Sequence, residues 1–314
     1  MGARGRPLSR NRKKGSLTIV GTGIQAITQV APEARFCIEQ ADKVLYFQSE
    51  PVSANWIRTL NPTAESLGRL YGTKKRRKLT YLEAVDQILH FVRKGLDVCV
   101  AFYGHPAVFC FPGHEAMRRA RRGGFPARML PAISSLDCLF ADVGIDPGRE
   151  GCQSFEASDF LLHSRKFDNT SPLILLQVAV IGESALPLRP CNREGVKILT
   201  RELRKHYPAN HKVVVYEAAQ FVVSKPHIVK VSLSALPRAY MTPATTLYVP
   251  PRSQPAANPR MLALLSKLCA KGSVSATPTG LDSGASPASD RLALLMNRGS
   301  GRARRGRKRG RSSN

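Results

Sequence analysis

Leu17-Thr18-Ile19-Val20-Gly21-Thr22-Gly23 opens the ordered pattern of this 314-residue chain. The apolar run predicts a buried strand, and the glycines predict a tight turn at its carboxyl end. Residues 21–26 also fit the dinucleotide-binding pattern G-x-G-x-x-(G/A). A nicotinamide site needs a long helix from that turn, which Pro32 interrupts, and an acidic residue after the second strand, where Phe47-Gln48-Ser49 stands instead. The turn therefore predicts a site for another kind of ligand.

Strand and helix patterns alternate through the first half of the chain. We expect strands at Lys43–Phe47, Asp97–Tyr103 and Ala127–Leu130, and helices after Pro32, from Thr80 to about Gly95, and from about His114 to Arg122. Short links between alternating elements are typical of an α/β domain with a mainly parallel sheet.

Pro131-Ala132-Ile133-Ser134-Ser135 predicts the passage into a second α/β domain with a mixed sheet. Its strands are expected at 173–180, 213–218, 228–233 and 245–249, with a helix near 193–206. From Pro250 onward the chain is rich in Pro, Ser, Gly and Ala, and its apolar islands are 261–268 and 291–296. The predicted organisation is an arm at 1–15, domains at 16–131 and 132–251, and a tail at 252–314.

The net charge of +26 is concentrated at the two ends. Residues 1–15 carry six basic side chains and residues 298–314 carry eight, with no acidic residue in either segment. Segments so poor in apolar residues cannot bury enough surface to offset the entropy of ordering, so we expect disordered tails. Their charge could contact nucleic acid or an acidic protein. Since no aromatic-laced basic strip accompanies it, solubilising tails with only non-specific RNA affinity are favoured.

The seven cysteines form no C-x-x-C pair and no Cys/His spacing typical of a metal site. They predict buried free thiols in a reducing compartment and no bound metal. The charged N-terminus lacks the apolar core of a secretory signal, and the longest apolar stretch, Pro172–Ile181, is too short to span a bilayer. A cytoplasmic protein without membrane contact is the simplest expectation.

Two tyrosines flank a basic segment in Tyr71-Gly-Thr-Lys-Lys-Arg-Arg77-Lys-Leu-Thr-Tyr81. Thr80 and Glu83 form a capping-box pattern, which predicts Tyr81 at the start of a helix. Free amides at that end and the nearby Arg77 would lower the pKa of a phenol. By composition alone the segment could equally be a solvated basic loop.

Tyr103-Gly104-His105-Pro106 follows a predicted strand of the same sheet as Gly21. In open α/β sheets, ligands bind at the carboxyl edge of the strands. Gly104 allows the backbone to approach a ligand, and Pro106 stiffens the turn. Taken alone, His105 is more typical of a hydrogen-bonded turn residue than of a catalytic base.

Gly21–Gly23, Tyr103–Pro106, Pro131–Ser135 and the closing Thr245-Thr-Leu-Tyr-Val-Pro-Pro251 together resemble the tetrapyrrole methylase superfamily, over about residues 16–250. Within it, Tyr-x5-Arg-x3-Tyr followed by Tyr-Gly-His-Pro resembles the borosin peptide-backbone α-N-methyltransferases. The resemblance implies two α/β domains with S-adenosylmethionine between them. It also implies methylation of backbone amide nitrogens in a ribosomal precursor peptide.

Carried over by position, the resemblance implies Tyr71, Arg77 and Tyr81 as catalytic residues, with either tyrosine as the base. It places Tyr103 beside the sulfonium methyl group. The remaining cofactor contacts that it implies are His105, Val108, Phe109, Ser134, Ser135, Gln177, Tyr216, Ala218 and Thr246.

Two departures from the family pattern bear on partners and on the fold. Members fused to their substrate end in an apolar core peptide, whereas the segment after Pro251 is polar and has no Val/Ile-rich run. The chain resembles instead the split members, so we expect methylation in trans by a homodimer that binds two precursor chains. Ala132 stands where the superfamily usually has glycine, which tightens one turn.

Two other functions remain open from the sequence. A tetrapyrrole C-methyltransferase would gain from the positive charge at Lys74–Lys78, but it gives the paired tyrosines no role. An RNA-associated protein would use the basic tails and leave the rest of the chain inert toward S-adenosylmethionine.

Overall fold

The computed structural model describes residues 14–48, 50–72, 75–185 and 191–272. The chain separates into two compact units, Met1–Gln254 and Pro255–Asn314. The predicted N-terminal arm lies almost wholly outside the described residues. In the second unit the described structure includes one helix, α9 (Pro259–Gly272), within the predicted tail. Its apolar island, Met261–Leu268, was visible in the sequence.

The first unit begins with a parallel five-stranded sheet of order β3-β2-β4-β1-β5, which confirms the predicted α/β class. Its strands are β1 (Ser16–Gly21), β2 (Lys43–Phe47), β3 (Glu65–Ser66), β4 (Asp97–Phe102) and β5 (Ala127–Met129). Its helices are α1 (Pro32–Gln40), α2 (Pro51–Leu60), α3 (Arg77–Arg93) and α4 (Phe111–Arg122), with a 3-10 turn η1 at Leu67–Leu70.

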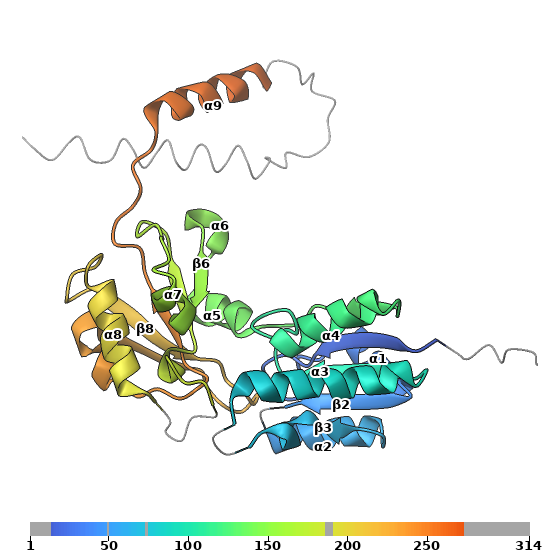
Figure 1. Cartoon of the computed structure of the whole chain (residues 1–314). Coiled ribbons are helices and arrows are strands. Elements are labelled where there is room, and N and C mark those ends of the chain that lie inside the picture. The colour runs from blue at the N-terminus through green and yellow to red at the C-terminus, as the bar shows by residue number, and fades with distance from the viewer. Residues whose placement is uncertain (1–13, 49, 73–74, 186–190, 273–314) are drawn as a thin grey trace, which may run out of the picture. The chain divides into compact units, whose positions relative to one another are not determined.

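The two faces of this sheet are covered by different helices (Figure 1). Alternate residues of β4 point to opposite faces, because the side-chain period of a strand is two. Val98 and Val100 pack under α3 and α4, whereas Cys99 and Ala101 pack under α1 and α2. Burial on both faces explains why β1, β2 and β4 are largely apolar.

The second sheet has the order β6-β7-β10-β8-β9 and is mixed, as predicted. Only β6 and β7 pair in parallel; the other neighbours are antiparallel. Its strands are β6 (Gln153–Glu156), β7 (Leu173–Leu176), β8 (Lys212–Glu217), β9 (His227–Ser232) and β10 (Thr246–Val249). Its helices are α5 (Ser135–Val143), α6 (Pro147–Glu150), α7 (Ala157–Leu162) and α8 (Arg193–Leu203), with 3-10 segments η2 (Val178–Val180) and η3 (Leu233–Arg238).

Several predicted boundaries are wrong, and two of these bear on the site. β7 ends at Leu176 rather than at Val180, because Gln177 takes a left-handed backbone conformation with φ of 59°. Helix α3 starts at Arg77 and not after Thr80, so there is no capping box. The amide of Arg77 donates instead to the carbonyl of Ser184 at 2.8 Å, a contact between distant parts of the chain. Tyr81 therefore lies in the second turn of the helix.

The described residues contain no helix long and apolar enough to cross a membrane and no His/Cys/Asp/Glu cluster able to hold a metal ion. The six cysteines whose side chains the structure describes are free thiols: Cys37, Cys99, Cys110, Cys138, Cys152 and Cys191. Only Cys99 and Cys191 are buried, and the other four are half-buried. The expectation that the thiols are all buried is therefore wrong for most of them.

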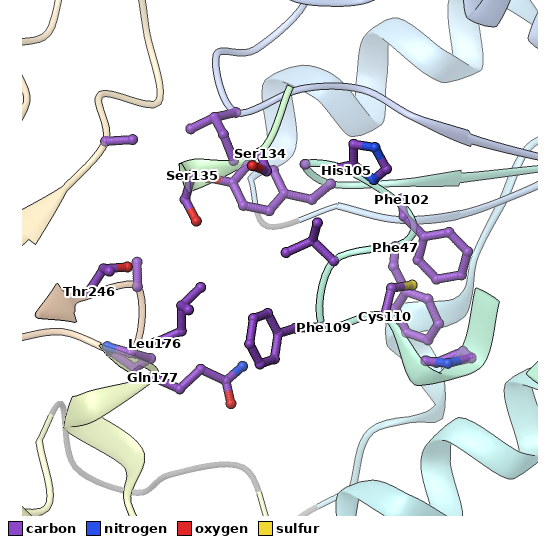
Figure 2. A pocket seen from close by; sticks show the side chains of 18 of the residues that line it. Phe47, Phe102, His105, Phe109, Cys110, Ser134, Ser135, Leu176, Gln177 and Thr246 are labelled. Carbon is purple, nitrogen blue, oxygen red and sulfur yellow. The ribbon is translucent and has the colours of Figure 1, made fainter. Parts of the chain in front are cut away.

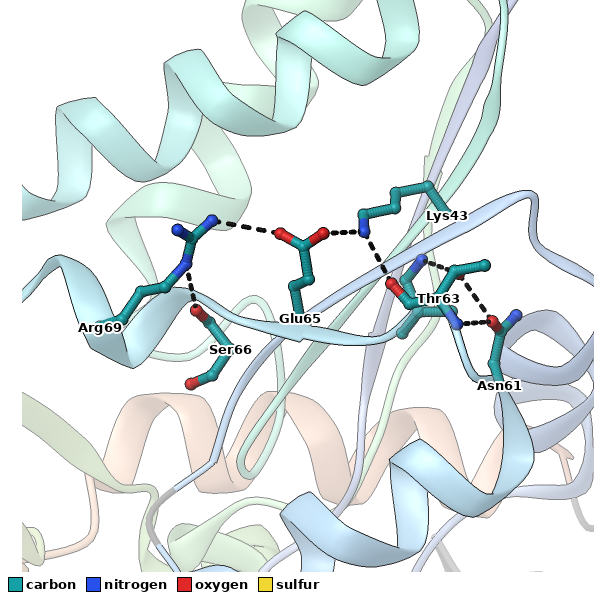
Figure 3. Close-up of polar contacts among 7 residues, drawn as sticks. Lys43, Asn61, Thr63, Glu65, Ser66 and Arg69 are labelled. Carbon is teal, nitrogen blue, oxygen red and sulfur yellow. Dashed lines mark hydrogen bonds and ion pairs between the residues drawn. The ribbon is translucent and has the colours of Figure 1, made fainter.

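A polar cluster fixes the edge strand β3 against β2 (Figure 3). The buried ammonium of Lys43 donates to the carbonyl of Thr63 at 2.8 Å and pairs with Glu65. Glu65 also pairs with Arg69 at 3.2 Å, and the Arg69 guanidinium donates to the carbonyl of Ser66. A two-residue strand has few ladder hydrogen bonds, so these side chains supply much of what holds it in register.

Asn61 carries the most polar contacts in this cluster and gives a stability prediction. It is 4% exposed, its amide group donates to two main-chain carbonyls at 2.9 Å, and its oxygen accepts the backbone amide and hydroxyl of Thr63. Asn61→Ala leaves buried polar groups unpaired, so we expect a loss of about 2–4 kcal/mol in the free energy of unfolding by urea titration. The control, Asn55→Ala, removes one exposed contact to Arg58 and should cost under about 0.5 kcal/mol. Equal losses would show that Asn61 has no special role.

Candidate active site

A cavity of about 310 Å³ lies where the strands of both sheets end, all within the first compact unit. Phe47 and Phe102 end β2 and β4, while Leu176 ends β7 and Thr246 begins β10. Figure 2 shows Leu176, Gln177 and Thr246 on one side of the cavity, with Phe109 between them and Phe47. The volume is at the low end of the range for small-molecule sites, roughly 300–1,000 Å³.

Glycines allow the backbone to close up beside this cavity. Gly23 and Gly104 form an isolated bridge, with the amide of Gly104 donating to the carbonyl of Gly23 at 2.9 Å. A Cβ on Gly21 would collide with the carbonyl oxygen of Gly104 and lie 2.5 Å from Ala132 Cβ and 2.7 Å from Pro106 Cδ. The turn of β1 and the Tyr103–Pro106 turn are therefore packed against each other with no space for a side chain.

Two residues that line the cavity hold unusual backbone conformations. Phe109 has φ of 53° and Gln177 has φ of 59°, in the left-handed region that bulky residues rarely adopt. Such strain costs about 1–3 kcal/mol per residue and clusters at ligand sites. Both residues line one cavity, which makes it the candidate functional site of the first unit, whereas the other described non-glycine residues with positive φ, Ile27 and Ser164, lie outside it.

Hydrogen bonds fix the polar side chains around the cavity. Ser134 caps α5: its hydroxyl accepts the amide of Asp137 at 3.3 Å and donates to the Asp137 carboxylate at 2.6 Å. The Nδ1 atom of His105 accepts the amide of Ala107 at 3.0 Å. Nδ1 is therefore occupied as an acceptor, and Nε2 is the ring nitrogen left to contact a ligand. His105 is both the turn residue that its sequence suggested and a residue that lines the cavity.

Tyr71 and Tyr81 approach each other at the cavity wall. Their ring centroids lie 6.4 Å apart with the planes at 81°, and both side chains line the cavity. Burial raises the pKa of Tyr71 well above its ordinary value of about 10, Tyr81 raises it further, and Arg77 lowers it by less. The positive surroundings expected to favour a phenolate are therefore outweighed at Tyr71 by desolvation. Tyr81 does not lie at the start of a helix, so the free amides expected beside its hydroxyl are absent.

Arg77 lies close enough to the tyrosine pair for its charge to act on Tyr71. It does not line the cavity; its guanidinium donates to the main-chain carbonyl of Glu183, and its amide donates to Ser184. It acts on Tyr71 through its charge. Tyr216 is also outside the lining, because its hydroxyl donates to Asp142 at 2.6 Å within the core under α5.

The structure brings the other predicted site residues together around the one cavity. They are Tyr71, Tyr81, Tyr103, His105, Val108, Phe109, Ser134, Ser135, Gln177, Ala218 and Thr246. The lining residues outside that predicted set are Ile24, Phe47, Phe102, Gly104, Cys110, Pro112, Leu176, Pro243 and Ala244. Most of these are apolar, and the signal that could have found Phe47 and Phe102 is their position at strand ends.

The lining contains no Asp, Glu, Lys or Arg among the described residues. Of the basic charge at Lys74–Lys78 that was expected to suit a large acidic macrocycle, the described part, residues 75–78, does not line this cavity. Burial also raises the pKa of the Cys110 thiol to about 12, so that side chain enters the lining as a neutral group. Apart from the imidazole of His105, the described lining consists of aromatic rings, hydroxyls, one amide and aliphatic groups.

Residues 16–234 match the tetrapyrrole (corrin/porphyrin) methylases. The chain belongs to this methylase family. Two solved structures support the fold of the methylase. A diphthine synthase superposes with a TM-score of 0.55 at 14% identity, covering 76% of this chain and 91% of that one. A uroporphyrin-III C-methyltransferase from Thermus thermophilus gives 0.55 at 16% identity, covering 85% and 100%.

Each curated relative of the methylase is named both as a methyltransferase and as a cyclic peptide precursor. The omphalotin A precursor of Omphalotus olearius is 39% identical over 254 residues, which cover 80% of this chain and 61% of the relative. The lentinulin A precursor of Lentinula edodes is 40% identical, with 77% and 59% covered. A type III borosin precursor of Anomoporia bombycina is 37% identical, with 79% and 29% covered. The methylase thus spans less than two thirds of each of these relatives.

Proposed function

We propose that this methylase transfers methyl groups from S-adenosylmethionine to backbone amide nitrogens of a peptide. Three observations support the proposal: family membership, the relatives named as methyltransferases and cyclic peptide precursors, and the site geometry. The observation that carries it is the pair Tyr71 and Tyr81, set edge to face in a neutral cavity with Arg77 behind them. A tetrapyrrole substrate would bring several carboxylates, and no cation of the described lining receives them.

The cavity fits S-adenosylmethionine by its own chemistry. Glycines at the strand ends let the main chain come close to a ligand, and two lining residues are held in strained conformations. The neutral polar groups of the lining suit a nucleoside that carries an amino-acid side chain. The residues that would hold it are Tyr103, His105, Val108, Phe109, Ser134, Ser135, Gln177, Ala218 and Thr246. When bound, S-adenosylmethionine supplies an electrophilic methyl group on a positively charged sulfur.

The two tyrosines can raise the nucleophilicity of the methyl acceptor, the amide nitrogen. An amide nitrogen is a poor nucleophile because its lone pair is delocalised into the carbonyl group. A phenolate oxygen of Tyr71 or Tyr81 would take the amide proton, and the positive charge of Arg77 would stabilise that phenolate and the developing charge on the amide oxygen. Because Arg77 is held by the carbonyl of Glu183, this charge has a fixed position.

The raised pKa of Tyr71 gives a pH dependence with a definite sign. The proton acceptor must be the phenolate, and below pH of about 10 only a small fraction of Tyr71 is ionised. With Tyr71 as the acceptor, the single-turnover methylation rate should rise about tenfold per pH unit from about pH 7 to about pH 9. A rate that levels off near neutral pH would exclude Tyr71 and leave Tyr81 as the base.

We further propose that the peptide is a separate chain bound by a homodimer of the methylase. The support is the composition of residues 252–314, which are polar and basic like the corresponding part of the split members that the sequence resembles. Light scattering of the methylase alone and with a candidate peptide measures this directly. A homodimer that gains two peptide chains agrees with the proposal, and a monomer contradicts it.

Incubation of the purified methylase with S-adenosylmethionine and candidate precursor peptides tests the proposed activity. Successive mass increments of one methylene group on the peptide are the expected result. S-adenosylmethionine binding without any peptide modification, combined with turnover of a tetrapyrrole, would favour the other activity of the family.

A further inference from the structure

Four aromatic side chains form one connected wall of the cavity, which we call the aromatic box: Phe47, Tyr71, Tyr81 and Phe102. Phe47 stacks on Phe102 with centroids 5.7 Å apart. It meets Tyr71 edge to face at 6.0 Å, and Tyr71 meets Tyr81 at 6.4 Å. The planes of these last two pairs are inclined at 68° and 81°, so the rings are walls of a corner rather than one flat stack.

The aromatic box lies in a cavity whose described lining has no carboxylate that could pair with a cation. All four rings line the cavity, and its described lining contains no Asp or Glu. A positive charge that leaves water for such a site needs compensation. The faces of aromatic rings carry negative potential and attract cations within about 6 Å of the ring centroid. The neighbouring phenol oxygens of Tyr71 and Tyr81 add further negative potential.

We propose that the aromatic box recognises the positive charge of the sulfonium ion and so distinguishes S-adenosylmethionine from its neutral product, S-adenosylhomocysteine. The inference rests on the proposed function, because it takes the cavity as the S-adenosylmethionine site. It explains why rings from the ends of β2 and β4, from the end of η1 and from helix α3 meet here. It also gives product release a physical basis, since loss of the methyl group removes the charge that the box holds.

Phe47→Leu is the variant that tests the box, because leucine keeps an apolar side chain at a half-buried position but removes the ring face. Isothermal titration calorimetry of both ligands gives two dissociation constants. We expect the constant for S-adenosylmethionine to rise about tenfold and that for S-adenosylhomocysteine to change less than about twofold. Phe47→Tyr, which keeps the ring, should show the wild-type ratio of the two dissociation constants.

The neutral ligand controls for folding, because a misfolded variant would lose both affinities. Phe36→Leu removes an exposed ring on α1 that does not line the cavity and should change neither constant. Equal weakening of both ligands by Phe47→Leu, or no weakening of either, would overturn the inference. A loss confined to peptide affinity would also overturn it and assign the box to a substrate side chain. Failure of the wild-type protein to bind either ligand would instead refute the proposed function.

Discussion

Tyr81→Phe is expected to lower the rate of peptide methylation by at least about 100-fold, since a general base typically contributes about 100- to 10,000-fold. The ring would stay in place against Tyr71 and Phe111, so packing is preserved. Affinity for S-adenosylmethionine should therefore stay within about threefold of wild type, because the ring face is retained. Single-turnover methylation and calorimetric binding, measured on the same preparation, separate the two effects.

The matched control for Tyr81 is Tyr240→Phe, which removes a phenol that is 66% exposed and does not line the cavity. Its methylation rate should equal the wild-type rate. Unchanged turnover in Tyr81→Phe would remove this residue from the mechanism. Should Tyr71→Phe abolish turnover while Tyr81→Phe retains it, the proton acceptor is Tyr71.

Gly21→Ala is expected to abolish S-adenosylmethionine binding, with an apparent affinity loss of at least about 100-fold. The added Cβ would collide with the carbonyl of Gly104 and with atoms of Ala132 and Pro106, so both turns must separate. Overpacking of this kind costs about 1–3 kcal/mol even where neighbours can relax. Here the neighbours are main chain, a short side chain and a ring, which yield little. Calorimetric titration with S-adenosylmethionine measures the loss.

Gly72→Ala provides the control for Gly21. A Cβ at Gly72 meets only side-chain atoms of Lys75, at 3.5 and 3.6 Å, which is ordinary contact. It should bind S-adenosylmethionine like the wild-type protein. Wild-type affinity in Gly21→Ala would show that the close approach of the two turns is not required for the site.

Most strands were predictable because they are apolar runs, which burial on both faces of a sheet selects. The polar strands β3 (Glu65–Ser66) and β6 (Gln153–Glu156) lack that signal and were missed. The strand-end position of Tyr103–Pro106 likewise predicted a ligand site. The start of α3 was not predictable. The sequence offered a capping box at Thr80, but the helix extends to Arg77, whose amide is satisfied by Ser184. A local pattern cannot reveal a partner over 100 residues away.

The environment of the tyrosines was mispredicted for a related reason. Basic neighbours in the sequence suggested a phenol with a lowered pKa, but burial dominates at Tyr71. Arg77 is directed to the carbonyl of Glu183 rather than into the cavity. Phe109 and Gln177 adopt left-handed conformations without being glycine, and only tertiary packing imposes that. Which side chains share a cavity depends on the meeting of two sheets, and strand periodicity does not encode it.

The central claim is that the methyl group is placed on a backbone nitrogen of another chain. Tandem mass spectrometry of a separate peptide, incubated with the protein and S-adenosylmethionine carrying a deuterated methyl group, tests it most directly. The account predicts label on main-chain fragments that contain the amide nitrogen, and none on side chains or on the protein itself. Label found only on a side chain, only on the protein, or on a tetrapyrrole in place of the peptide would contradict it.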